Sequence, residues 1–168
     1  YKYNMIIYLK NKHTLIVDDF IFKCCIGKNG LSNNKLEGDN KTPKGTFKLG
    51  FLYYRKDRSK KIQSNLKVIE IRKTMGWCDD KRDKKNYNKL IKINKRIKHE
   101  KLFRKDNKYD VFIPIQYNSV KRILGKGSCI FLHLTKNYKP TAGCIAISKE
   151  DFMIMIKIIS SNATIKIG

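Results

Sequence analysis

Most of the chain consists of short runs rich in β-branched and aromatic residues, and in several of them apolar and polar positions alternate. This pattern is typical of β-strands, with turn residues between them. We expect strands at 5–9, 14–17, 20–26, 46–49, 68–71, 110–117, 129–134, 144–148 and 163–167. The first three are separated by Asn-Lys and Asp-Asp, which predicts an antiparallel meander.

Two stretches depart from the strand pattern and indicate helices. Ser148 and Asp151 form an S-x-x-D capping box, and apolar residues follow at helical spacing from Phe152 to Ile159. This is the principal helix, near the C-terminus, and its wide apolar face predicts that it is well buried. A second, short helix is predicted within the basic stretch 89–108.

The strand at 110–117 contains a proline. Its alternating sets are Val111, Ile113, Ile115 and Tyr117 on one face and Asp110, Phe112, Pro114 and Gln116 on the other. The alternation predicts a half-buried strand, but Pro114 has no N–H to donate to a sheet ladder. We therefore expect this strand at a sheet edge or a bulge.

The remaining segments are predicted loops. The stretch 27–45 holds four glycines and four asparagines, and a loop this long in a small domain is often functional. A second irregular region, 75–88, carries the one tryptophan. Since neither a repeat nor a linker interrupts the 168 residues, we expect one domain over 1–168. Its fold class is mostly β (β-rich α+β), a sandwich or mixed sheet with one principal C-terminal helix.

Charge and cysteine content change this picture in two ways. The formal net charge is +24, from 38 Lys plus Arg against 14 Asp plus Glu, which favours contact with polyanions. The lysines are spread along the whole chain, so compositional background explains the charge equally well.

The five cysteines include no C-x-x-C, so no metal site, cofactor or disulfide framework is predicted. No run of 18 apolar residues is present, so no membrane span is predicted. Separately, we expect the protein to be a monomer.

His133 and Cys144 are the residues most suited to covalent chemistry. Successive side chains of a strand alternate between its two faces. In 129–134 the aliphatic residues are on one face and His133 is on the other, and in 144–148 the isoleucines are on one face and Cys144 is on the other. If both aliphatic faces point into the core, the thiol and the imidazole share the outer side of the sheet. Cys129 shares that face too, but four positions separate it from His133, about 13 Å along a strand, so it is not the expected nucleophile.

An imidazole next to a thiol can take its proton and so produce the thiolate that attacks carbonyl groups. Gly143, just before the cysteine, permits unusual backbone angles and places amides where a tetrahedral oxyanion forms. These residues alone leave a second interpretation open. In that interpretation Cys144 is a small buried apolar residue and His133 an ordinary strand residue.

The stretch "IFLHLTKNYKPTAGCIAIS" resembles the catalytic segment of the L,D-transpeptidase (YkuD-type) family. That segment has a histidine, a loop, Ser or Thr, a variable or histidine position, then Gly and the nucleophilic Cys. Upstream, "GKNGLSNNKLEGDNKTPKGTFKLG" resembles the family's loop and strand around T-P-x-G-x-F. With "YYRKDR", "GWCDD" and "YDVFIPIQYN", the similarity covers most of residues 20 to 160.

The resemblance implies roles for four residues. Cys144 is the nucleophile, His133 its general base, Gly143 part of the oxyanion site and Thr141 the Ser/Thr of the motif. The implied reaction is acyl transfer: a peptidoglycan tetrapeptide stem loses D-alanine and forms a thioester on Cys144. An amine of another stem then gives a 3→3 cross-link, or water gives L,D-carboxypeptidation, or the wall is joined to a protein. The implied compartment is the periplasm or cell envelope, although no signal peptide is visible in the chain.

The motif departs from many relatives at two positions. Ala142 and Ala146 stand where S-H-G-C-x-R members have histidine and arginine, so the sequence is closer to a short branch with T-x-G-C-x-A. Without that arginine, another cation must bind the substrate's carboxylates. The candidates from the other matching blocks are Lys41, Arg55 and Arg58.

Further candidate substrate-binding residues lie in the loops. Asp39 lies in the long loop with Glu37 and Thr42, and residues of these types either line a cleft or form ordinary turns. Trp77 either stacks on the substrate or packs a loop against the core, and packing is the preferred interpretation. Tyr138 lies between His133 and Cys144 and is expected near the cleft.

Two other function classes compete with this enzyme. A polyanion- or nucleic-acid-binding module would use the net charge and leave the Cys–His pair without a role, but no RNA-recognition or helix-turn-helix pattern supports it. A papain-like amidase places its cysteine before the histidine, and a sortase separates the two residues by a much longer segment. The order and short spacing of His133 and Cys144 argue against both enzymes.

Overall fold

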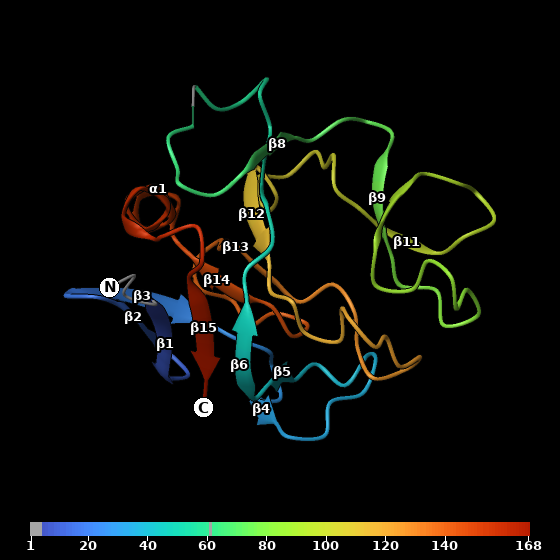
Figure 1. Cartoon of the computed structure of the whole chain (residues 1–168), viewed down its shortest axis with the longest axis horizontal. Coiled ribbons are helices and arrows are strands. Elements are labelled where there is room, and N and C mark those ends of the chain that lie inside the picture. Colours follow the sequence, from blue (N-terminus) through green and yellow to red (C-terminus); the bar gives the residue numbers. More distant parts are fainter. Residues whose placement is uncertain (1–4, 61) are drawn as a thin grey trace.

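The computed structural model describes residues 5–60 and 62–168 (Figure 1). Within these ranges the chain forms strands and one helix, α1 (Lys149–Ile158). The strands are β1 (Ile6–Asn11), β2 (Thr14–Val17), β3 (Phe20–Cys25), β4 (Leu31–Ser32), β5 (Thr42–Pro43), β6 (Gly45–Lys48), β7 (Leu52–Tyr54), β8 (Val68–Glu70), β9 (Met75–Cys78), β10 (Leu90–Lys92), β11 (His99–Lys101), β12 (Val111–Pro114), β13 (Phe131–Leu134), β14 (Ile145–Ile147) and β15 (Thr164–Ile167). The predicted mostly β fold class is confirmed; that 1–168 forms one domain stays a prediction.

Ten of the described strands form one mixed, curled sheet in the order β6-β15-β1-β2-β3-β14-β13-β12-β7-β8. The antiparallel meander β1-β2-β3 is confirmed. It joins the second half of the sheet through β14, where Ala146 pairs with Cys25. In that half β13 and β14 run parallel, which is the arrangement that matters for the site.

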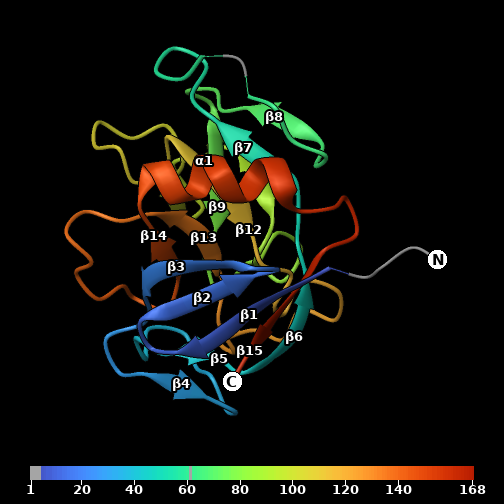
Figure 2. The ribbon, with the colours of Figure 1, turned by 90° about the vertical axis from the view of Figure 1, so that its left-hand side faces the viewer.

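The helix and the aliphatic faces of the sheet form the first core. The Ser148 side chain accepts a hydrogen bond from the Asp151 N–H, as the capping box predicts, and the acidic first turn suits the positive end of the helix dipole. Phe152, Met155 and Ile156 are buried against β13 and its neighbours. Figure 2 shows α1 lying across β12, β13 and β14, above the β1–β3 meander.

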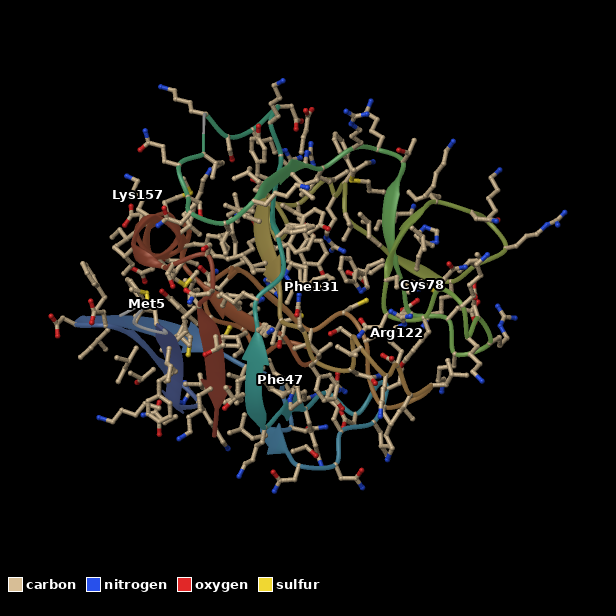
Figure 3. All side chains as sticks on the ribbon, in the orientation of Figure 1. Met5, Phe47, Cys78, Arg122, Phe131 and Lys157 are labelled. Atoms are coloured by element: carbon tan, nitrogen blue, oxygen red, sulfur yellow. The ribbon has the colours of Figure 1, made fainter. Side chains whose placement is uncertain are left out.

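A second, aromatic core lies on the opposite face of the same central strands. We call it the aromatic cluster, and its buried members are Tyr53, Ile71, Leu102, Tyr109, Phe112, Phe131 and Cys144. A small sheet of order β10-β9-β11 covers it, with Met75, Trp77 and Leu90 packed against it. Figure 3 places Phe131 near the centre of the molecule. Both faces of β12, β13 and β14 are therefore buried.

The structure corrects two sequence predictions. The helix predicted within 89–108 is wrong, because this stretch forms the short strands β10 and β11 on either side of β9. The edge position predicted for Pro114 is also wrong, since β12 lies between β7 and β13. Pro114 ends its strand, and the ladder with β7 stops at Phe112, so the missing N–H falls outside that ladder.

Candidate active site

His133 and Cys144 are held on adjacent parallel strands. His133 pairs with Ala146 and Leu132 with Ile145, so Cys144, immediately before β14, lies diagonally across from the histidine. The two residues share a strand face, as the alternation of side chains predicts. That face is not the open outer surface, because the aromatic cluster covers it: His133 is 2% exposed and Cys144 is 8% exposed.

The imidazole of His133 is oriented by a backbone carbonyl. Its Nδ1 lies 2.8 Å from the Leu134 carbonyl oxygen, so Nδ1 carries the proton and donates it. The ring of Tyr109 packs edge-on against the imidazole at 5.5 Å. Among the described residues Nε2 has no hydrogen-bond partner although it is buried, which leaves its lone pair free. Burial, with the charge of Lys108, lowers the pKa of His133 to about 3, so the imidazole is neutral.

The thiol of Cys144 is held by two backbone groups. It donates to the Cys129 carbonyl at 3.1 Å and accepts from the Phe131 N–H at 3.3 Å. Burial raises the pKa of Cys144 to about 11, against the lowering effects of the Phe131 N–H and Lys108. The free protein therefore holds a protonated thiol and a neutral imidazole on the same strand face, rather than a thiolate–imidazolium pair.

The turn before Cys144 is clamped by hydroxyl groups. The buried Thr42 hydroxyl donates to the Gly143 carbonyl at 2.8 Å and accepts from the Gly27 N–H at 2.9 Å. The Thr141 hydroxyl donates to the Cys144 carbonyl at 2.6 Å and accepts from the Gly143 N–H at 3.1 Å. The long loop 27–45 therefore acts as a support for the turn that carries the cysteine.

Gly143 is required at its position for two reasons. Its φ is +142°, and a Cβ added there would lie 2.8 Å from the Lys41 carbonyl oxygen. We expect Gly143→Ala to lower the free energy of unfolding by about 2–5 kcal/mol, from backbone strain and overpacking together. Chemical denaturation measures this change.

Gly38→Ala is the matched control, because Gly38 also has a positive φ, +80°, but nothing lies within 4 Å of an added Cβ. We expect it to cost about 1–2 kcal/mol. Equal losses for the two variants would contradict the steric role of the Lys41 carbonyl.

Two hollows flank the pair of residues. The thiol hollow, about 160 Å³, is lined by Lys35, Glu37, Gly38, Asp79, Glu100, Lys108, Tyr109, Ser128, Cys129, Ile130, Ala142, Gly143 and Cys144. The imidazole hollow, about 200 Å³, is lined by Asp106, Asn107, Lys108, His133, Leu134, Thr135, Lys136, Lys139, Pro140, Thr141 and Ala146. Lys108 lines both hollows.

The cations named from the sequence lie elsewhere. Arg55 and Arg58 line a separate hollow and are paired with Asp57 and Asp110, at 2.6 and 2.9 Å. Lys41 meets the turn at Gly143 through its backbone carbonyl and lines neither hollow. These three residues are therefore not gathered with Cys144.

The other predicted residues have mostly structural contacts. Asp39 accepts hydrogen bonds from the Leu36 and Lys41 N–H groups and pairs with Lys35 at 2.6 Å, so it organises the long loop. Trp77 packs edge-on against Phe131 at 5.2 Å, in line with the preferred packing interpretation. Tyr138 lies under the Lys23 ammonium, which is 4.4 Å from its ring centroid.

Sequence reasoning missed Lys35, Lys108 and Tyr109, which line the thiol hollow. Lys35 is 4% exposed, although nothing about its neighbours in the sequence predicts a buried lysine. The Tyr109 hydroxyl donates to Glu100 at 3.0 Å, which brings a carboxylate from β11 to the same place. Since β11 itself was not predicted, this contact was not visible in the sequence.

The buried neutral imidazole predicts a pH dependence of stability. The folded pKa of His133, about 3, lies below its ordinary value of 6.5, so the unfolded chain binds a proton that the folded protein does not. The contribution of the neutral His133 to the free energy of unfolding is therefore fully present above pH 6.5. It is lost as the pH falls towards 3, by about 1.4 kcal/mol per pH unit. Denaturation of wild type and His133→Gln at pH 7, 6, 5 and 4 measures this slope. A slope unchanged by the substitution would contradict burial of a neutral imidazole.

Comparison with known families identifies the family of the chain. The model of the L,D-transpeptidase catalytic domain (YkuD) matches residues 2–167, nearly the whole chain. Searches of curated proteins and of solved structures returned no match. Among the described residues no group of His, Cys, Asp and Glu side chains is arranged to hold a metal ion, and no helix has the length and apolarity to span a membrane. From the family match over the region that holds the His–Gly–Cys site, we conclude that the chain belongs to the L,D-transpeptidase catalytic domain (YkuD) family.

Proposed function

We propose that the protein is a cysteine-dependent L,D-transpeptidase that acts on peptidoglycan tetrapeptide stems. One observation carries the proposal: a buried imidazole with a free Nε2 lies on the same strand face as a buried thiol, and a backbone carbonyl orients the ring. A neutral imidazole with an unoccupied lone pair is the form that can accept a thiol proton. A purely structural histidine in such surroundings would be expected to have both ring nitrogens satisfied.

In the first half of the reaction, Cys144 attacks the carbonyl carbon of the L,D peptide bond before the terminal D-alanine. The thiol proton passes to His133 Nε2 as the sulfur–carbon bond forms. The carbon–nitrogen bond then breaks, His133 returns the proton to the leaving amine, and free D-alanine departs. The product is a thioester between the stem tripeptide and Cys144.

In the second half an amine of another stem attacks the thioester. His133 takes a proton from that amine, the carbon–sulfur bond breaks, and the proton returns to the Cys144 sulfur. The result is a 3→3 cross-link. Water in place of the amine would give the tripeptide, which is L,D-carboxypeptidation.

The turn at Gly143 suits the proposed intermediate. The carbonyls of Gly143 and Cys144 are both held by threonine hydroxyls, so the peptide planes of the turn are fixed. Fixed amides need no reorganisation when charge develops on the tetrahedral oxygen. The Gly143 N–H already donates to the Thr141 hydroxyl, so we assign the oxyanion role to the Cys144 N–H, which Gly143 helps to place through its unusual backbone angles.

Mass spectrometry of defined muropeptides separates the candidate reactions. A disaccharide tetrapeptide is incubated with wild type and with Cys144→Ala. We expect a cross-linked dimer and free D-alanine from the wild type alone. Tripeptide without dimer would select the carboxypeptidase instead. Unchanged substrate would contradict both the transpeptidase and the carboxypeptidase hypotheses and would favour the polyanion-binding module.

The proposed substrate sets the compartment. Peptidoglycan lies outside the cytoplasmic membrane, so we infer that the protein works in the periplasm or cell envelope. Fractionation of cells that produce the full-length protein tests this inference, and recovery in the cytoplasmic fraction alone would contradict it.

A further inference from the structure

The imidazole hollow lies beside Ala146, the position that corresponds to the arginine of the S-H-G-C-x-R motif. Ala146 lines this hollow, is 1% exposed and pairs directly with His133 across the parallel strands. A longer side chain at position 146 would start at the wall of the hollow and extend into it. Because alanine is short, that space is open in this chain.

Lysines from two loops line the same space. Lys108 comes from the segment before β12, and Lys136 and Lys139 come from the loop between β13 and β14. Asp106 also lines the hollow, but Arg104 donates to its carboxylate at 2.9 and 2.7 Å. The Asp106 charge is thus balanced, and the lysines leave the hollow with an excess of positive charge.

Lys108 is distinguished from the other cations near the site. It lines both hollows, and its charge acts on both the imidazole and the thiol. Lys35, the other cation of the thiol hollow, is already paired with Asp39 at 2.6 Å. Within the described part of the chain no carboxylate forms an ion pair with Lys108, whose ammonium lies 5.3 Å from the centre of the Tyr109 ring.

We propose that the imidazole hollow binds the terminal carboxylate of the donor peptide and that Lys108 is the cation that holds it. The inference rests on the proposed function. If His133 returns its proton to the leaving amine, that nitrogen lies next to the imidazole, and its carboxylate is only one carbon further away. At ~30 Å³ per water-sized group, a hollow of about 200 Å³ has room for one small amino acid.

In this interpretation the cation comes from the loop before β12, and Ala146 of β14 contributes no charge to the hollow. An ammonium is a compact point charge without the fork of an arginine, so Lys108 recognises the carboxylate by charge rather than by two parallel hydrogen bonds. Specificity for a free C-terminal carboxylate then depends on Lys108 while the nucleophile and base stay unchanged.

Peptide binding to the Cys144→Ala protein tests the subsite without turnover. Dissociation constants of a stem tetrapeptide ending in D-alanine, and of the same peptide with a C-terminal amide, are measured by NMR titration. We expect the amide to bind about 10- to 100-fold more weakly, the size of one charge-assisted contact. Adding Lys108→Gln should reduce this ratio to within about 3-fold, and Lys108→Arg should retain it.

Lys105→Gln is the matched control. It removes the same charge three positions earlier in the same segment, but Lys105 lines the separate hollow of Arg55 and Arg58. We expect this variant to keep the full preference for the carboxylate. Equal binding of the two peptides, no binding of either, or a preference that survives Lys108→Gln would overturn the inference. Carboxylate-selective binding without D-alanine release by the wild type would overturn the proposed function alone.

Discussion

Cys144→Ala is expected to reduce D-alanine release from a tetrapeptide stem by about 10⁴-fold or more, because the thioester can no longer form. The side chain is small and buried, and alanine removes only the sulfur, so the fold should persist. The two backbone groups that hold the thiol, the Cys129 carbonyl and the Phe131 N–H, remain in place. Chromatographic measurement of D-alanine, with circular dichroism of the variant, checks the prediction.

Cys129→Ala is the control for this variant. Cys129 lines the same hollow, and burial raises its thiol pKa well above the ordinary value. Its carbonyl, not its thiol, contacts Cys144, and the substitution leaves that carbonyl intact. We expect activity within about 3-fold of wild type, well below the loss of a nucleophile. If Cys129→Ala abolished activity while Cys144→Ala did not, the nucleophile would be Cys129.

His133→Gln is expected to lower kcat by about 10²- to 10⁴-fold, which is the usual contribution of a general base. Burial raises the pKa of Cys144 to about 11, so at neutral pH the thiol depends on a base to lose its proton. As pH rises towards 11, hydroxide supplies more thiolate, and the variant should recover part of the lost rate. Steady-state rates between pH 6 and pH 10 measure both effects.

His99→Gln is the matched control for the histidine. The Nδ1 of His99 also lies against a backbone carbonyl, that of Ile97, at 2.7 Å, but His99 lines neither hollow. We expect its rate and pH profile to match those of wild type. A parallel loss in both variants would indicate that fold damage, not a missing base, explains the effect.

The central geometry of the site follows from strand alternation. Because Ile130, Leu132 and Leu134 belong to the first core, His133 must lie on the other face, and the same reasoning places Cys144 opposite Ile145 and Ile147. The helix was visible in its capping box and apolar spacing. These signals are local, so one sequence suffices to predict them.

The cover over that face was not predictable, because it depends on pairings between distant segments. β10 and β11 are three residues each and contain charged side chains, so their local pattern does not indicate strands. They become strands by pairing with β9, and together they bury the face that alternation alone would leave open. The burial of His133 and Cys144, and therefore their shifted pKa values, follows from this cover.

The cations near the site were not predictable from the sequence for the same reason. Arg55 and Arg58 are in blocks that resemble the family, yet their guanidinium groups are paired with nearby carboxylates in another hollow. Lys108 carries no sequence signal, and it reaches the site because Lys108 immediately precedes the Tyr109 that packs on His133. Such proximity between loops is a property of the tertiary structure.

The intact mass of the protein after a short incubation with a tetrapeptide stem, quenched with acid, tests the proposed nucleophile most directly. Acid slows the release of a thioester, so the acyl-enzyme persists long enough to weigh. We expect wild type to gain the mass of the stem tripeptide acyl group, localised to Cys144 by peptide mapping, and Cys144→Ala to gain nothing. Release of D-alanine with no adduct at any time, or an adduct on another residue, would contradict a thioester on Cys144.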